Sequence, residues 1–265
     1  MVDAPFRLAV GQSPAQLSTT AARLAWLHEI LPDVVANQTD LLLLPELFAT
    51  GYNIGDQIKA RAEPADGPTA QTIAALAKEH GLAIHYGYGE ASGTDLFNSA
   101  QCFGPDGARL GGHRKLAIPP GFEADYFTRG KGCSLFKYRG LRISTLICYD
   151  AEFPETARHV AAMGADLILV PTALGARWGW VAQTMIPTRG YENGVFLAYA
   201  NSAGTENGMD FLGQSFICAP DGEELARAAD GPEIIYAVLE PSRVEAAQSR
   251  LPYLVDVKTL KGDAL

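Results

Sequence analysis

Three short segments from the first half of the chain recur in the same order in the second half. This internal repeat limits the possible folds more than any other feature. The matching pairs are residues 39–45 with 165–171, residues 80–87 with 193–200, and residues 98–107 with 213–222. The last pair closes in the same Pro-Asp-Gly sequence, which is typical of a turn between strands. The repeat predicts two similar half-layers. No linker or low-complexity stretch separates them, so we expect residues 1–265 to form a single domain.

Short apolar runs of strand length alternate with longer segments of helical period. The runs cover residues 6–10, 40–44, 82–86, 142–147, 166–170 and 195–199. The helical segments are an apolar stripe from Leu17 to Val34, residues 69–80, and a segment from Pro154 to Gly164. Runs that are apolar at nearly every position are typical of strands covered on both faces. We therefore expect an α/β fold, a four-layer αββα sandwich with two pseudo-symmetric halves.

Beyond Pro241 both the helical and the strand patterns become weak. We expect residues 241–265 to form a C-terminal tail that packs on another surface, with a partner subunit as one candidate.

Composition and charge exclude several classes of function. The chain has a net charge of −9 and no run rich in lysine and arginine, so nucleic acid and anionic membranes are not expected partners. No apolar stretch approaches the roughly 20 residues that span a bilayer, and the first residues lack a signal-peptide layout. The expected location is therefore cytoplasmic. The cysteines at 102, 133, 148 and 218 lie far apart, which argues against a disulfide framework or a metal site.

Glu46, Lys115 and Cys148 could carry chemistry, although each also has an ordinary structural explanation. Glu46 follows the apolar run 41–45, and the ends of such strands are where α/β folds bind ligands. Cys148 ends the run 141–147 just before a predicted helix N-terminus, which can lower the pKa of a thiol. A loop glutamate, a small buried cysteine and a surface lysine explain the same residues equally simply.

In combination these residues match a known pattern. The segments Leu-Leu-Leu-Pro-Glu46, His113-Arg-Lys115 and Ile147-Cys-Tyr-Asp-x-x-Phe-Pro-Glu155 resemble the signature segments of the nitrilase superfamily of carbon–nitrogen hydrolases. The resemblance spans nearly the whole chain, from Val10-Gly-Gln12 to residues 252–256, and includes residues 189–193 and 200–204. It implies an αββα sandwich, a homodimer or higher homo-oligomer, a Cys-Glu-Lys triad and no cofactor or metal.

The resemblance also implies roles for individual residues. Cys148 would be the nucleophile and Glu46 the proton carrier. Lys115, with the backbone N–H of Tyr149, would stabilise the oxyanion. Glu123 matches a second family glutamate beside the triad, although on its own it could equally be an exposed loop carboxylate.

The residues after Cys148 bear on the substrate. Relatives that act on N-carbamoyl amino acids carry arginines there to hold the substrate carboxylate, whereas this chain has Asp150 and Glu152, which disfavours an anionic substrate. Nitrilases commonly show Trp-Glu after the cysteine, and Tyr149-Asp150 is more similar to the amidase branches. We therefore expect a small neutral carboxamide as the partner molecule, hydrolysed through a Cys148 thioester. The predicted pocket residues are Tyr52, Phe122, Thr172, Trp178 and Trp180, although aromatic residues at such spacing more often serve packing.

Other functions remain open at this stage. A nitrilase, an omega-amidase or an N-carbamoyl hydrolase would use the same triad. A different class is a redox or binding protein that uses Cys148 without turnover. Residues 87–93 resemble a dinucleotide-binding loop only weakly, because the glycine spacing is wrong.

Overall fold

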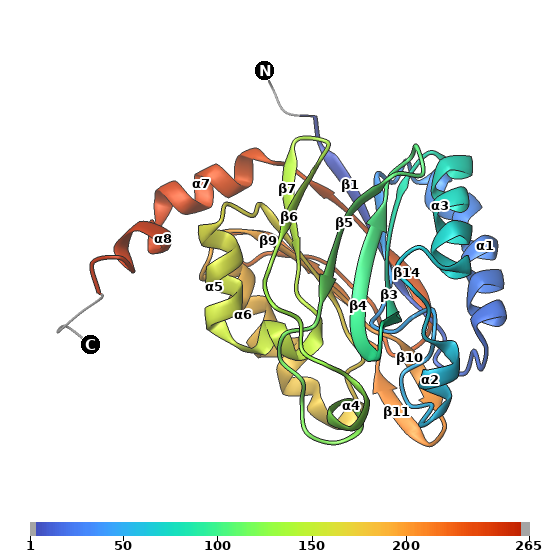
Figure 1. Cartoon of the computed structure of the whole chain (residues 1–265). Coiled ribbons are helices and arrows are strands. Elements are labelled where there is room, and N and C mark those ends of the chain that lie inside the picture. The colour runs from blue at the N-terminus through green and yellow to red at the C-terminus, as the bar shows by residue number, and fades with distance from the viewer. Residues whose placement is uncertain (1–3, 261–265) are drawn as a thin grey trace.

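The computed structural model describes residues 4–260, which form two six-stranded sheets packed face to face with helices outside (Figure 1). The first sheet has the order β14-β1-β2-β3-β4-β5. Its strands are β1 (Phe6–Gln12), β2 (Leu41–Leu43), β3 (Ala83–Ser92), β4 (Asp95–Phe103), β5 (Arg109–Arg114) and β14 (Glu233–Leu239). The second sheet has the order β13-β12-β9-β8-β7-β6. Its strands are β6 (Leu135–Tyr138), β7 (Leu141–Thr145), β8 (Leu167–Pro171), β9 (Phe196–Ala200), β12 (Phe216–Cys218) and β13 (Glu224–Arg227).

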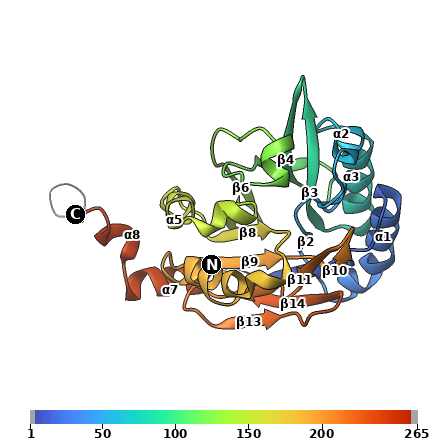
Figure 2. The same ribbon diagram turned by 90° about the horizontal axis from the view of Figure 1, so that it is seen from below.

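Helices cover the outer faces of both sheets, which gives the predicted αββα layers (Figure 2). Helices α1 (Thr20–Ala36) and α3 (Pro68–His80) cover the first sheet, and α5 (Pro154–Ala162) and α6 (Ile186–Tyr191) cover the second. The remaining elements are α2 (Gln57–Arg61), α4 (Phe122–Tyr126), the 3₁₀ turns η1 (Cys148–Glu152) and η2 (Ala176–Trp178), the π-helical turn η3 (Val181–Met185), and the hairpin of β10 (Ala203–Glu206) and β11 (Met209–Leu212).

Strand β2 shows why the runs are apolar at every residue. Leu41 and Leu43 face the other sheet and pack against Ile143 and Leu167, whereas Leu42 and Leu44 face the helices. Successive side chains of a strand point to opposite faces, so a strand between a sheet and a helix layer needs apolar residues in every position.

The two sheets repeat one topology, as the internal repeat predicted. In each half three parallel strands, β1-β2-β3 or β7-β8-β9, are followed by two antiparallel ones, β4-β5 or β12-β13. An outer strand pairs antiparallel with the first strand of each half: β14 with β1, and β6 with β7. The repeated sequence segments fall on β2 and β8, on β3 and β9, and on β4 and β12.

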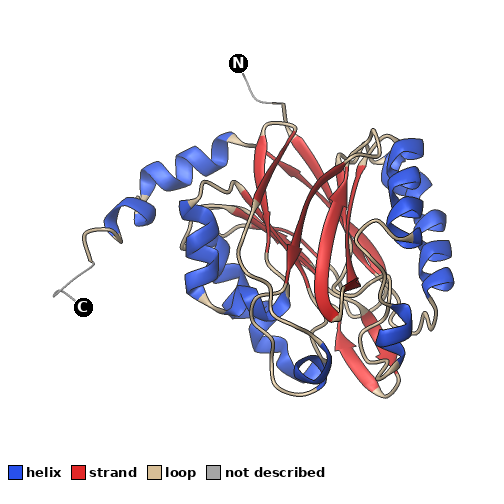
Figure 3. Cartoon of the chain, viewed as in Figure 1, coloured by secondary structure: helices blue, strands red, loops and turns tan. Residues whose placement is uncertain are grey.

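The C-terminal tail is more regular than its sequence pattern suggested. It forms α7 (Ser242–Arg250) and α8 (Tyr253–Asp256) and runs outward from the body of the molecule (Figure 3). In α7 only Val244 and Ala247 are buried, so the helix carries too few apolar residues to produce a visible stripe. Of the predicted tail, residues 261–265 lie outside the described part. Within residues 4–260, the structure contains no helix of the length and apolarity needed to cross a bilayer.

Candidate active site

The three predicted catalytic residues lie just beyond strand ends that converge where the sheets meet. Glu46 follows β2, Lys115 directly follows β5, and Cys148 follows β7. Gly87 of β3 makes room for the turn that carries Glu46, because a Cβ atom there would lie 2.5 Å from the Leu47 nitrogen. Such a contact is closer than packing allows. The absence of a side chain on the neighbouring strand therefore sets the position of Glu46.

Lys115 lies at the centre of a buried ionic cluster. Its side chain is fully buried, and Nζ donates to Glu46 Oε1 at 2.7 Å and to both carboxylate oxygens of Glu123 at 2.7 Å. Glu123, in α4, is 1% exposed and is therefore a member of the cluster, not an exposed loop carboxylate. Charges removed from water in this way require close partners, and Lys115 is the partner of both carboxylates.

Two further side chains complete the cluster. Asn98 Nδ2 donates to Glu46 Oε1 at 2.7 Å and to Glu123 Oε2 at 3.0 Å, and the Tyr52 hydroxyl donates to Glu123 Oε1 at 2.8 Å. Sequence reasoning missed Asn98, although it is the polar residue that begins the repeated segment 98–107. Glu46 Oε2 has no hydrogen-bond partner within residues 4–260, so one oxygen of this carboxylate remains available.

The cluster shifts the pKa values of its members. Burial, with Glu123 nearby, raises the pKa of Glu46 to about 7 even though Lys115 acts to lower it. Burial by itself would lower the pKa of Lys115, but Glu46 and Glu123 raise it above its usual value. At neutral pH Lys115 is therefore charged, and Glu46 is able both to accept and to release a proton.

The thiol of Cys148 does not have the lowered pKa that its place before a helix suggested. Cys148 is 8% exposed, and burial together with the charge of Glu46 raises the pKa of the thiol, while Lys115 acts to lower it. The local prediction was wrong because burial and a carboxylate from a distant segment outweigh a helix N-terminus. At rest the sulfur is protonated.

The backbone around Cys148 forms a tight turn. Cys148 has a φ of +46°, a left-handed conformation that is uncommon for a residue with a side chain, and it begins the 3₁₀ turn η1. The N–H groups at the start of such a turn have no partner inside it. The Tyr149 N–H is one of these groups, as its predicted role requires.

Thr172 brings the end of β8 into the same site. It is fully buried, its hydroxyl donates to the Tyr199 hydroxyl at 3.0 Å, and its contact with Cys148 acts to lower the pKa of the thiol against the larger effect of burial. The Glu46 N–H donates to the Thr172 carbonyl at 3.3 Å, which joins the ends of β2 and β8.

The predicted aromatic pocket residues fall into two groups, one that lies at the ionic cluster and one that is exposed. The rings of Tyr52 and Phe122 lie 5.6 Å apart, and the Tyr52 hydroxyl contacts the cluster directly. Trp178 is 54% exposed and Trp180 is 71% exposed. These two indoles therefore do not form a wall enclosed by this chain alone, and their place in the substrate pocket stays a prediction.

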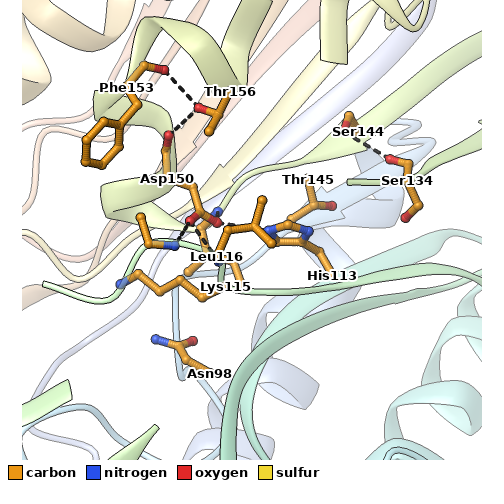
Figure 4. A network of polar contacts seen from close by, with 12 residues as sticks. Asn98, His113, Lys115, Leu116, Ser134, Ser144, Thr145, Asp150, Phe153 and Thr156 are labelled. Carbon is orange, nitrogen blue, oxygen red and sulfur yellow. Dashed lines mark hydrogen bonds and ion pairs between the residues drawn. The ribbon is translucent and has the colours of Figure 1, made fainter. Parts of the chain in front are cut away.

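Asp150 does not face a substrate, contrary to the sequence argument. Its carboxylate is fully buried and accepts hydrogen bonds from protein donors, including His113 and Leu116 (Figure 4). The adjacent Glu152 is part-buried, and burial raises the pKa of its carboxyl while Lys115 acts to lower it. The case against an anionic substrate therefore rests on Glu152 alone.

Comparisons with known proteins agree with this geometry. The carbon-nitrogen hydrolase family matches residues 7–249, so the chain belongs to that family. The "Hydrolase in pqqF 5'region" of Pseudomonas protegens is 40% identical over 94% of this chain and 88% of its own length. The "(R)-stereoselective amidase" of a Pseudomonas species is 32% identical over 83% of this chain and 80% of its own length.

A solved structure of a Nesterenkonia amidase from the nitrilase superfamily has a TM-score of 0.81 at 28% identity, covering 96% of this chain and 97% of that one. Another structure of that amidase has acrylamide added to its active-site cysteine. The chain is therefore an amidase-like, cysteine-dependent carbon–nitrogen hydrolase of the nitrilase superfamily.

Proposed function

We propose that the protein hydrolyses a small neutral carboxamide to a carboxylic acid and ammonia through a thioester on Cys148. The observation that carries this proposal is the buried cluster itself. In this cluster a fixed ammonium lies beside a carboxylate that has one oxygen without a partner within residues 4–260, and the charges of both groups act on the Cys148 thiol. A Nesterenkonia amidase with a TM-score of 0.80 and 27% identity has been solved in complex with butyramide, a small neutral amide, which supports this substrate class.

In the first half-reaction Glu46 acts as base and Cys148 as nucleophile. Glu46 Oε2 takes the thiol proton while the sulfur attacks the amide carbon, so the two pKa values need not be matched in the resting state. Negative charge moves to the amide oxygen, where Lys115 Nζ and the Tyr149 N–H stabilise it. Glu46 then gives its proton to the departing nitrogen, ammonia leaves, and the acyl group remains on sulfur.

The second half-reaction reverses the direction of proton transfer. Water attacks the thioester carbon as Glu46 takes one of its protons, and the same two donors stabilise the second oxyanion. The tetrahedral intermediate collapses, the thiolate leaves and recovers the proton from Glu46, and the carboxylic acid is released. Glu123, bonded to Lys115 through both oxygens, keeps the ammonium charged throughout.

The test is a panel of butyramide, the matched nitrile and an N-carbamoyl amine, incubated with the parent protein and with Cys148→Ala. We expect ammonia from the amide, a mass increase on the parent equal to the acyl group, and neither with the variant. Equal ammonia release by the parent and the variant would contradict the proposal, as would turnover of the carbamoyl compound alone.

The other two compounds are included because similar proteins bear other names. The "Nitrilase" of Pyrococcus abyssi is 32% identical over 78% of this chain, and the "N-carbamoylputrescine amidase" of Arabidopsis thaliana is 32% identical over 81%. A redox role for Cys148 is not supported, because redox-sensing cysteines have low pKa values and are accessible, whereas this thiol is buried and its pKa is raised.

We also propose that the chain forms a homodimer through the face formed by α5, α6 and the tail helix α8. Apolar residues on this face remain exposed, namely Met163 at 42%, Tyr191 and Tyr253 at 38%, and Val255 at 60%. Exposed apolar side chains grouped on one face mark an interaction surface. Light scattering after gel filtration should give twice the chain mass, and Val255→Asp should reduce it to that of one chain. A parent protein that elutes with the mass of one chain would contradict this proposal.

A further inference from the structure

We propose that Asp150, together with His113, is a positioning residue that locks the Lys115 segment onto the Cys148 turn. This inference rests on the proposed function, because it concerns where the ammonium lies relative to the reacting carbon. Neither residue is part of the triad, and Asp150 was first interpreted as a substrate-facing residue.

The Asp150 carboxylate is saturated by donors from two segments. Oδ1 accepts from the N–H groups of Leu116 at 2.9 Å and Ala117 at 2.7 Å. Oδ2 accepts from the Ile147 N–H at 3.0 Å and lies 2.9 Å from His113 Nε2. An ionised carboxylate has about four acceptor sites, so none remains for water or substrate. Bonds to a charged acceptor are also stronger than neutral ones.

The donors belong to the two segments that must meet for catalysis. His113, Leu116 and Ala117 flank Lys115 at the end of the first sheet, and Ile147 precedes Cys148 at the end of the second. Asp150 itself lies in η1, and its carbonyl oxygen accepts from the hydroxyl of Thr156 in the first turn of α5 (Figure 4). One side chain therefore bridges the two sheets at the site.

His113 is suited to orient Lys115. The two residues are separated by one position at the end of an extended strand, where side chains at i and i+2 point to the same side. His113 is 6% exposed, and its Nδ1 has no partner within residues 4–260, so the imidazole is anchored through Nε2. Because a carboxylate only accepts, Nε2 carries the proton in this bond.

The backbone contacts of Lys115 itself do not fix its distance from Cys148. Its N–H donates to the Asn98 carbonyl at 2.8 Å and its carbonyl accepts from Gly130 at 2.7 Å, contacts that do not involve the Cys148 turn. The contacts through Asp150 do tie it to that turn. A displacement of about 1 Å in a catalytic group can cost about 100-fold in rate, so this link has a measurable kinetic effect.

A matched pair of variants tests the inference. His113→Gln places an amide N–H near the position of Nε2 and preserves the donor, whereas His113→Leu removes it at similar size. For His113→Leu we expect kcat per folded molecule to fall by about 10- to 100-fold with KM nearly unchanged. His113→Gln should recover most of this loss. His159→Leu is the control, because His159 is an exposed histidine on α5.

Two readouts separate positioning from a general loss of structure. Lys115 lowers the pKa of Glu46, so moving it away should raise the pH at which the acid limb of kcat/KM appears. In a crystal structure of His113→Leu, Lys115 Nζ should lie more than about 3.5 Å from Glu46 Oε1, against 2.7 Å in the parent. This distance can be measured even if the parent hydrolyses no amide, so failure of the proposed function would be recognised separately.

Asp150→Asn provides the second test. The new amide retains one acceptor oxygen but presents its own donors toward the N–H of Ile147 and toward His113, so the loss should exceed that of His113→Leu. A His113→Leu protein with unchanged kcat, unchanged acid limb and unchanged Lys115 position would overturn the inference, whatever its thermal stability. If Asp150→Asn does not fold, the histidine pair still decides the question.

Discussion

The two halves of the molecule place different side chains at equivalent strand ends. The repeat aligns residues 39–45 with 165–171, so Thr172 in the second half corresponds to Glu46 in the first. The strand registers pair Leu8 with Leu41 and Ile143 with Leu167, and by the same offset Ser13 corresponds to Cys148. Extending the pair 98–107 with 213–222 sets Gly213 against Asn98 and Asp230 against Lys115.

These equivalent positions differ mainly in charge. The buried polar groups bonded to Ser13 and to its neighbour Gln12 are neutral: Ser13 Oγ lies 3.1 Å from Ser202 Oγ, and Ser215 donates to Gln12 at 2.8 Å. Asp230 is exposed, whereas Lys115 is fully buried. The same arrangement of strands thus supports a neutral hydrogen-bonded cluster at the Ser13 end and a buried ionic cluster at the Lys115 end. Because burying charge is costly, the ionic cluster is the one that indicates function.

We expect the largest decrease in kcat when Glu46 is replaced, because the equivalent strand end in the second half carries no carboxylate. Glu46→Gln removes the group that accepts and returns protons in both half-reactions, so kcat should fall by about 10,000-fold, the upper range for acid–base catalysis. Steady-state ammonia release measures it. Ser13→Ala, at an equivalent strand end, should leave kcat within about twofold. If kcat of Glu46→Gln falls by less than about tenfold, the proposed functional difference between the strand ends that carry Glu46 and Ser13 is wrong.

Replacement of the buried cation Lys115 should have the second-largest effect on kcat. Lys115→Met removes the oxyanion donor, which typically costs about 100- to 1000-fold in kcat. It also leaves Glu46 and Glu123 without their cation, and breaking a buried ion pair costs about 3–5 kcal/mol of the free energy of unfolding. Urea denaturation checks the second number. Asp230→Ala should change neither quantity, and a comparable loss there would show that position matters more than burial.

The pH dependence sharpens the same contrast. The proposed base is active when ionised, and the pKa of Glu46 is raised to about 7. As pH falls below about 7, kcat/KM should therefore decrease about tenfold per pH unit, while above it the acid limb levels off. Rates measured from about pH 5 to 9 show the limb. An acid limb with an apparent pKa near 4.5, the ordinary value for glutamate, would mean that burial does not set the pKa of the base.

The smallest expected effect belongs to the neutral cluster. Ser13→Ala removes one buried hydroxyl contact, worth about 1 kcal/mol, which corresponds to a decrease of roughly 2–4 °C in Tm for a chain of this size. Calorimetry measures the shift. An unchanged Tm would indicate that Ser202 finds another partner in the variant.

Much of the fold was predictable because it is local and repeated. Four consecutive leucines predicted strand β2, and the repeat of this segment on β8 predicted the second half of the molecule. The contact between Glu46 and Lys115 was predictable because their segments carry family motifs. What the sequence did not reveal depends on contacts between distant segments. Asn98 on β4 contacts Glu46 beyond the intervening strand β3, and the raised pKa of the Cys148 thiol results from burial and from the charge of Glu46.

Asp150 illustrates a different limit. Its proximity to Cys148 in the chain suggested that it faces the substrate, but in a 3₁₀ turn successive side chains point in directions about a third of a revolution apart. The direction in which this carboxylate points is decided by the donors of the Lys115 segment. Helix α7 was missed for a simpler reason, since it buries only two residues.

The pairing of β1 with β14 also has a consequence for how the protein is made. Strand β1 leaves the ribosome long before β14, with which it pairs, so the first sheet cannot close at that edge until Leu239 has been synthesised. At typical rates of translation this takes on the order of 10 to 50 s. During that time the β1 edge, buried in the finished protein, can pair with other chains. We therefore expect slowed elongation between β1 and β14 to reduce soluble yield more than slowing before β1.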